Sequence, residues 1–271
     1  MLKAQKEDEK FIASSVMEGI ISIRAVIDGR ERGVNTRKIE RVLYDVSKQK
    51  SKARELAFLR SKAKAHDFEL FGVSKDKIDA LTIGSSHGGI VALCSERAYG
   101  EINDGDIVGG GFYVMLEGIE DPYNFGYALR SIYAAGADGI LLSERNWLGA
   151  AGVVARASAG ASEQMNIYVG SPEDAIKKFK NAGYAVFAAD KSKDSASIYD
   201  VDINFPALLL IGGERRGLSA PVMALADKKI CLDYGRRFPA ALSAASAASI
   251  ISFEIFRQNR GHDGGNGGKD K

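Results

Sequence analysis

Residues 207–217 read ALLLIGGERRG, and this stretch decides the fold class of the 271-residue chain. Residues 207–211 are continuously apolar, which predicts a buried strand of a parallel sheet rather than a half-exposed strand of alternating polarity. Gly212 and Gly213 follow at once, and glycine lets the backbone turn sharply and lets a ligand approach closely. We therefore expect a cofactor or anion loop directly after this strand.

Strand-like and helix-like segments alternate on both sides of this stretch. The expected strands are 112–117, 138–142, 166–169, 184–189, 207–211 and 229–233, and the clearest helices are 172–183 and 240–258. Such alternation predicts an α/β domain with a mostly parallel sheet that is covered on both faces.

A second, smaller α/β unit precedes this domain. Apolar residues recur at helical spacing in 11–27, strand-like segments occupy 39–45, 68–74 and 89–95, and helical segments occupy 52–67 and 75–82. We place a small domain at 10–97, a linker at 98–110, the parallel-sheet domain at 111–259 and a disordered, glycine-rich tail at 260–271.

Composition narrows the class of protein. Hydrophobic residues make up 45% and charged residues 27% of the chain, and no apolar run approaches the roughly 20 residues that span a bilayer. The first ten residues are charged, so we expect a cytoplasmic protein without a membrane partner. Cys94 and Cys231 fit reduced thiols, and the three histidines lack the spacing of metal ligands, so we expect no metal.

Positive charge is concentrated near the amino terminus. The net charge is only +2, but residues 30–64 hold twelve Lys and Arg against four Asp and Glu. A local excess of this kind suits a polyanion such as RNA, although a solvated helix face has the same composition.

Two common nucleotide-binding patterns do not occur. A dinucleotide fingerprint would follow the first strand of the large domain, where the sequence reads GIEDPYNFG at 118–126. The chain also contains no GxxxxGK[ST], which disfavours a P-loop enzyme.

The segment 121–130, DPYNFGYALR, connects a strand to a helix. Asp121 or Asn124 can cap that helix, and Phe125 and Leu129 with Ile132 form its buried stripe. Arg130 lies off the stripe, so it is either a functional side chain or a surface residue of a capped helix.

These segments together resemble the SpoU-type (TrmH-like) RNA methyltransferases of the SPOUT superfamily. Residues 124–142 resemble the first signature, in which Asn, Gly and Arg are followed by a Gly before the next strand. ARASAGAS at 155–162 resembles a Ser-Ala-Gly-Ala segment, and LLLIGGERRGLS at 208–219 resembles the second signature. LDYGRRFPAALSAASAA at 232–248 stands in the place of the third.

The resemblance implies a deep trefoil knot at the carboxyl end and S-adenosylmethionine as the cofactor. It also implies a homodimer that methylates a ribose 2′-hydroxyl in RNA. Residues 11–97 resemble the RNA-binding domain that precedes many SpoU enzymes, which favours ribosomal RNA over transfer RNA.

The resemblance also assigns roles to individual residues. Arg130 would act at the hydroxyl or the adjacent phosphate, as an orienting and charge-stabilising group because a guanidinium seldom loses its proton. Asn124, Glu214 and Ser243 complete the predicted catalytic set. The predicted cofactor-binding residues are Gly212, Gly213, Leu232 and Leu242. Glu214 would hold the loops through backbone N–H groups or face the substrate; it could also simply pair with Arg215 or Arg216.

The third signature departs from the family pattern. Asp233 and Tyr234 replace a usual Pro-Met, the loop is one residue longer, and Ser243 stands where Asn is usual. These changes motivate an alternative, a catalytically inactive knotted protein that binds RNA. A second alternative is an unrelated α/β enzyme that binds phosphate through residues 212–217.

Overall fold

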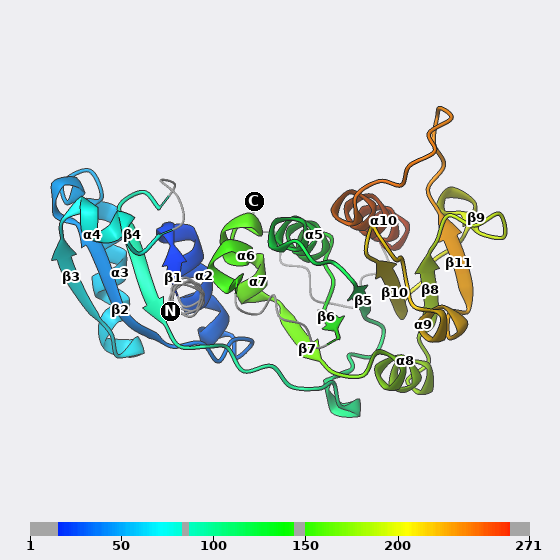
Figure 1. Cartoon of the computed structure of the whole chain (residues 1–271). Helices are drawn as coiled ribbons and strands as arrows, with labels where there is room; N and C mark the ends of the chain where they lie inside the picture. The colour runs from blue at the N-terminus through cyan, green and yellow to red at the C-terminus, as the bar shows by residue number, and fades with distance from the viewer. Residues whose placement is uncertain (1–15, 83–86, 144–149, 261–271) are drawn as a thin grey trace, which may run out of the picture. The chain divides into compact units, whose positions relative to one another are not determined.

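The computed structural model of the chain describes residues 16–82, 87–143 and 150–260 (Figure 1). They form two compact units. The first comprises the described parts of 1–100, 120–130 and 145–166, and the second those of 101–119, 131–144 and 167–271. The units interleave along the chain, and the domain boundaries expected from the sequence stay predictions.

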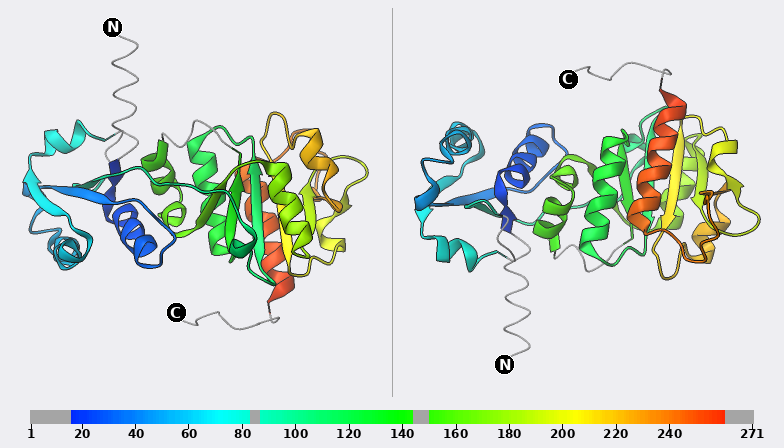
Figure 2. Two further views of the ribbon diagram at one scale, coloured as in Figure 1. Left: turned by 90° about the horizontal axis from the view of Figure 1, so that it is seen from below. Right: turned by 90° about the horizontal axis from the view of Figure 1, so that it is seen from above.

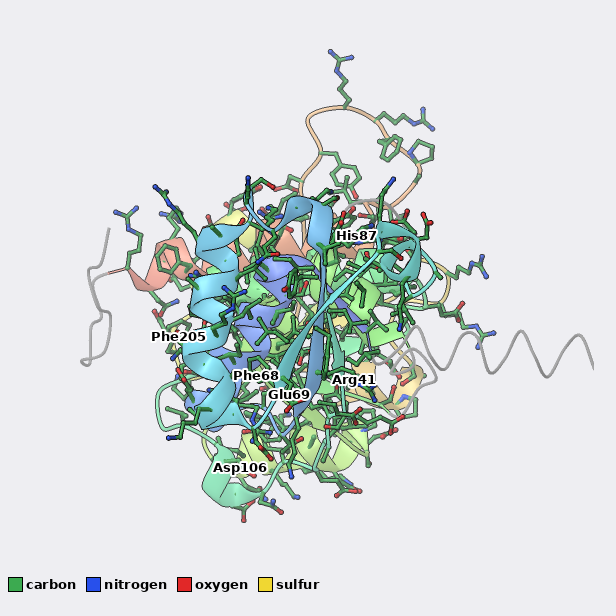
Figure 3. The ribbon with its side chains drawn as sticks, turned by 90° about the vertical axis from the view of Figure 1, so that its left-hand side faces the viewer. Arg41, Phe68, Glu69, His87, Asp106 and Phe205 are labelled. Carbon is green, nitrogen blue, oxygen red and sulfur yellow. The ribbon has the colours of Figure 1, made fainter. Side chains whose placement is uncertain are left out.

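A four-stranded sheet organises the first unit. Its order is β1 (Val16–Glu18), β4 (Ile90–Cys94), β2 (Ile39–Asp45) and β3 (Glu69–Val73), antiparallel except for the β2–β3 pair. Arg41 of β2 lies opposite Glu69 of β3 (Figure 3). The helices of this unit are α2 (Gly19–Glu31), α3 (Ala53–His66), α4 (Lys75–Asp79), α6 (Ala151–Ala157) and α7 (Ala161–Gln164).

The helix expected over 11–27 is wrong in its first described part. Val16–Glu18 form β1, which pairs with β4, and the helix begins only at Gly19 and continues to Glu31. The buried side chains of Val16 and Met17 complete the sheet, and Gly19 adopts φ +78°, which separates the strand from the helix. Residues 11–15 lie outside the described residues.

A seven-stranded sheet organises the second unit, in the order β7 (Asn166–Val169), β6 (Gly139–Leu142), β5 (Phe112–Glu117), β10 (Ala207–Gly212), β8 (Ala185–Ala189), β11 (Lys228–Cys231) and β9 (Ala196–Ser197). The pairs from β6 to β9 are all parallel, which confirms the mostly parallel sheet. The carboxyl ends of β5, β10, β8 and β11 therefore share one edge.

Helices cover both faces of this sheet (Figures 1 and 2). Leu208 and Leu210 of β10 pack in one apolar cluster with Phe179 of α8 (Pro172–Asn181) and Val222 of α9 (Ala220–Ala224). The helix α10 (Ala244–Asn259) contacts β10 as well. Because alternate residues of a strand face opposite sides, the continuously apolar sequence of β10 reflects this double burial.

Polar side chains and glycines fix the ends of these helices. The Ser171 hydroxyl accepts a hydrogen bond from the Asp174 N–H at the start of α8, where Pro172 is the first helical residue. Gly136 adopts φ +87° after α5 (Pro122–Ala134), and its N–H donates to the Tyr133 carbonyl.

Ile102, in the predicted linker, is buried in the apolar cluster that contains Phe179 of α8, so this segment packs within the second unit.

Candidate active site

The loop after β10 is shaped by close contacts between backbone segments. A Cβ on Gly213 would lie 2.0 Å from the Gly118 carbonyl oxygen, and one on Gly212 would lie 2.2 Å from the Gly217 carbonyl carbon. Gly217 adopts φ +63° and its N–H donates to the Gly213 carbonyl, at 2.8 Å. The sharp turn is confirmed. The close approach that these glycines permit is made by the chain itself, since Gly118 follows the neighbouring strand β5.

We expect the substitution Gly213→Ala to destabilise the second unit. A methyl group cannot rotate away from the backbone oxygen of Gly118, so the free energy of unfolding should fall by about 3 kcal/mol. Urea denaturation followed by circular dichroism measures this change. Gly235→Ala is the matched control, because no heavy atom beyond the neighbouring residues lies within 4 Å of its added Cβ. Equal stability of the two variants would contradict the role assigned to the Gly213–Gly118 contact.

Two glutamates tie the ends of this loop to other segments of the sheet edge. Glu117 Oε2, at the end of β5, accepts a hydrogen bond of 2.8 Å from the Ser219 N–H. Glu214 Oε1 accepts one of 3.3 Å from the Ala244 N–H, in the first turn of α10. Of the roles considered for Glu214, the structure shows the contact with a backbone N–H group. The first turn of a helix favours a carboxylate at this position.

The segment that resembles the third signature lies between β11 and α10. Ser243 is the N-cap of α10, and its Oγ accepts from the Ser246 N–H at 3.1 Å. Leu232 and Leu242 are half-buried. The Leu242 N–H donates to the Tyr234 hydroxyl at 3.1 Å, so a residue that departs from the family pattern bonds a predicted cofactor-binding residue.

Asn124 and Arg130 both lie on α5. The Asp121 carboxylate accepts hydrogen bonds from the Tyr123 and Asn124 N–H groups, at 3.4 and 3.1 Å, so Asp121 is the cap. Phe125, Leu129 and Ile132 are buried and Arg130 is exposed, as the stripe predicted. These two residues belong to the first unit, whereas Glu214, Ser243 and the four cofactor-binding candidates belong to the second.

The Ser-Ala-Gly-Ala segment packs tightly within the first unit. A Cβ on Gly126 would lie 2.5 Å from the Ala157 side chain, and one on Gly160 would lie 2.5 Å from that of Ala25 in α2. These glycines therefore let α5 and α2 approach α6 and the following turn. The glycine of the first signature has a packing role in this structure.

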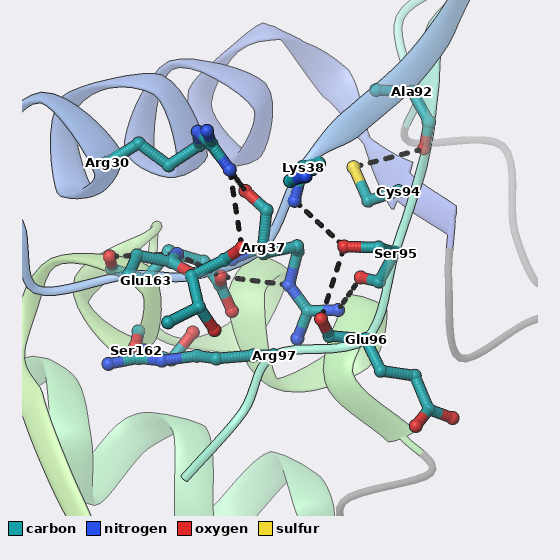
Figure 4. Close-up of polar contacts among 12 residues, drawn as sticks. Arg30, Arg37, Lys38, Ala92, Cys94, Ser95, Glu96, Arg97, Ser162 and Glu163 are labelled. Atoms are coloured by element: carbon teal, nitrogen blue, oxygen red, sulfur yellow. Dashed lines mark hydrogen bonds and ion pairs between the residues drawn. The ribbon is translucent and has the colours of Figure 1, made fainter.

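A buried ionic cluster holds the end of the same segment (Figure 4). Glu163 Oε2 lies 3.1 Å from Arg37 Nε and 2.6 Å from Asn35 Nδ2, and the side chains of Arg37 and Glu163 are each 3% exposed. Arg97 donates to the carbonyls of Ser162, Val34 and Met165. Burial favours a lower pKa for Arg37, but the neighbouring Glu163 opposes this and the pKa stays above its usual value.

The first unit also contains a pocket of about 250 Å³. Its lining residues Lys52 and Arg156 pair with Glu55 and Glu18, at 2.9 and 2.7 Å, and His87 Nε2 lies 3.0 Å from Asp79 Oδ1. His87 is only 3% exposed. Because Lys52, Arg156 and His87 each already contact a carboxylate, we assign the pocket no ligand.

Within the described ranges, no three His, Cys, Asp or Glu side chains gather as a metal site would require. Across 16–82, 87–143 and 150–260, no helix has the length and apolar character needed to cross a bilayer. Cys94 and Cys231 are both free thiols, and burial raises the pKa of Cys94 to about 12.

The fold and this edge define an α/β protein in which loops with glycines and glutamates meet at the carboxyl ends of parallel strands. The sequence model of the SpoU rRNA Methylase family matches residues 111–253. A Staphylococcus haemolyticus protein described as a putative TrmH family tRNA/rRNA methyltransferase is 31% identical over 193 residues, which cover 69% of this chain and 76% of that protein. The chain belongs to the SpoU family of RNA methyltransferases.

Two further similarities extend over most of the chain. The Bacillus subtilis protein YacO, a putative TrmH family tRNA/rRNA methyltransferase, is 28% identical over 240 residues, which cover 85% of this chain and 94% of YacO. The crystal structure of the SpoU methyltransferase AviRb from Streptomyces viridochromogenes, in complex with AdoMet, superposes with a TM-score of 0.74. It is 22% identical and covers 93% of this chain and 97% of AviRb, which shows a shared fold.

Proposed function

We propose that this chain transfers a methyl group from S-adenosylmethionine to a ribose 2′-hydroxyl in structured RNA. The observation that carries the proposal is the backbone cradle at the carboxyl edge of the second sheet. There Gly213 contacts Gly118, and Glu117 and Glu214 fix the two ends of the 212–219 loop. Ligands of open parallel sheets bind at this edge, and AviRb carries AdoMet on the same fold.

The residues at this edge fit such a cofactor. The half-buried Leu232 and Leu242 offer apolar surface for an adenine, and the half-buried Gly212 begins the loop that would lie against it. When bound, S-adenosylmethionine supplies the electrophilic methyl group of a sulfonium. We propose that the crossing of the 118, 212–219 and 232–243 segments forms the deep trefoil knot that the resemblance implies.

The proposed roles of the polar residues follow from their chemistry. The Arg130 guanidinium is exposed on α5 and would hold the ribose oxygen or the adjacent phosphate in line with the methyl group. It would also stabilise the negative charge that grows on the oxygen as its proton leaves. Asn124 would position the substrate, and Ser243 would act through its cap on α10.

Calorimetric titration with S-adenosylhomocysteine tests the cofactor site. The wild-type protein should bind with micromolar affinity, and Gly212→Trp should abolish binding because its side chain would meet residues 217 and 218. Gly109→Trp is the matched control, since a Cβ there has no neighbour within 4 Å. Absence of binding by the wild-type protein at high concentration would refute the proposal.

The RNA is proposed to contact the basic face of the first unit. Of the twelve basic residues in 30–64, several already serve the fold: Arg37 pairs with Glu163, Lys52 with Glu55, and Lys62 with Glu31. Lys50, Arg54, Arg60 and Lys64, on and before α3, are exposed. Because residues 11–97 resemble the RNA-binding domain that precedes many SpoU enzymes, we propose structured ribosomal RNA rather than transfer RNA. Competition between the two RNAs in a methylation assay tests this preference.

A homodimer is proposed through α10. Three large apolar side chains of this helix occur at three-residue steps and are exposed: Ile250 by 40%, Phe253 by 45% and Phe256 by 42%. An exposed apolar patch of this kind marks an interface. We expect Phe253→Asp to convert a dimer into a monomer, measured by light scattering after gel filtration. Val108→Asp changes a similarly exposed apolar residue outside α10 and should leave the dimer intact. A dimer that persists in the Phe253 variant would place the interface elsewhere.

A further inference from the structure

Lys191 anchors the loop that connects β11 to α10. It lies just after β8, the strand between β10 and β11 in the sheet. It follows the carboxyl end of β8, and its Nζ donates hydrogen bonds of 3.0 and 2.7 Å to the carbonyls of Phe238 and Ala240. The same ammonium lies 4.5 Å from the centre of the Tyr234 ring. One cation therefore contacts the beginning and the end of the loop.

Tyr234 connects Lys191 to Leu242, because it contacts both residues. Its ring lies beside Lys191 and 6.0 Å from the Phe238 ring, and its hydroxyl accepts from the Leu242 N–H at 3.1 Å. The preceding Asp233 is bonded in turn by the Ser197 hydroxyl, from β9. Both residues that replace the usual Pro-Met pair thus have a dedicated polar partner.

We propose that Lys191 and Tyr234 are positioning residues for the cofactor site, which set the backbone of the 234–242 loop and hold Leu242 in place. The inference rests on the proposed function for the meaning of Leu242, but the anchoring itself does not. A proline fixes the backbone through its ring, whereas here the exposed Lys191 ammonium binds two backbone carbonyls and lies against an aromatic ring. The altered third signature is then a different scaffold for the same loop.

Lys191→Met is the informative variant, because it keeps the length of the side chain and removes the charge and both hydrogen bonds. We expect trypsin to cleave after the exposed Arg236 and Arg237 about tenfold faster, since the loop opens more often. The Kd for S-adenosylhomocysteine should rise about tenfold, the scale of losing charge-assisted hydrogen bonds. The kcat at saturating S-adenosylmethionine should change less than about threefold, because Lys191 is not proposed to touch the RNA.

Three companion variants keep the test sharp. Lys191→Arg should restore binding to within about threefold of wild type, because a guanidinium can also donate twice and stack on the ring. Tyr234→Phe should weaken binding by removing the acceptor of the Leu242 N–H, and it decides the matter if the methionine variant does not fold. Lys193→Met, an exposed neighbour, should behave as wild type.

The outcomes separate the two proposals. One outcome would overturn the role of Lys191 and Tyr234. In it, wild type binds S-adenosylhomocysteine, and the Lys191→Met and Tyr234→Phe variants show the same affinity and the same rate of trypsin cleavage as wild type. Faster cleavage of the Lys191 variant, without cofactor binding by any variant or by wild type, would overturn the proposed function and leave Lys191 a loop anchor alone.

Discussion

Arg130→Ala should lower kcat for methyl transfer by about a hundredfold to a thousandfold, the cost of removing one charge-stabilising donor from a transition state. The Kd for S-adenosylhomocysteine should stay at the wild-type value, since the cofactor-binding candidates lie on the loops after β10 and β11. Folding should also be unaffected, because Arg130 is exposed and the buried stripe of α5 is formed by other residues. A single-turnover assay with radiolabelled S-adenosylmethionine and ribosomal RNA measures the effect.

Arg130→Lys is the control for charge. It retains a cation but loses the planar fork of donors, so an intermediate rate is expected if orientation matters as well as charge. An alanine variant that methylates at the wild-type rate would remove Arg130 from the mechanism. Such a result would leave the cofactor site intact as a proposal.

Glu163→Gln should lower the free energy of unfolding of the first unit by about 3–5 kcal/mol. The change leaves the guanidinium of Arg37 buried without its counter-charge, in a site where both side chains are 3% exposed. Urea denaturation followed by circular dichroism measures the loss. Because a shift of this size approaches the whole stability of many domains, partial unfolding at 37 °C is expected as well.

The matched control is an ion pair on the surface of the same unit. Lys75 and Asp79 lie 3.7 Å apart with side chains 65% and 42% exposed, and Lys75→Gln should leave the urea midpoint unchanged. If both variants showed the same midpoint as wild type, the Glu163 cluster would not be a stabilising element of the first unit.

The large sheet could be predicted from the sequence because its central strand is buried on both faces. The run ALLLIG needs apolar residues at every position, and this pattern differs from that of any surface strand. The three-residue β1 could not be found in the same way. Val16 and Met17 also fit the helical spacing of the residues that follow, and only pairing with β4 distinguishes the two.

The candidate site shows the same division between local and distant information. The glycines of 212–217 were correctly predicted to form a sharp turn, because a tight turn requires particular residue types at adjacent positions. Glu117 and Lys191 were not identified, and neither has a motif of its own. Their partners, Ser219 and the carbonyls of Phe238 and Ala240, lie 102, 47 and 49 residues away, so only the folded chain brings them together.

The residues of the Glu163 cluster are synthesised at widely separated times. Asn35 and Arg37 are made early, yet their acidic partner lies 128 and 126 residues further along the chain. While the ribosome is still translating the intervening codons, the nascent segment carries a cation that its finished core will bury. The strands of the amino-terminal sheet have all been synthesised once Cys94 is added, but Arg37 gains its buried counter-charge only after Glu163 has left the exit tunnel. The first unit therefore completes its buried ion pair only after a much later part of the chain has been translated.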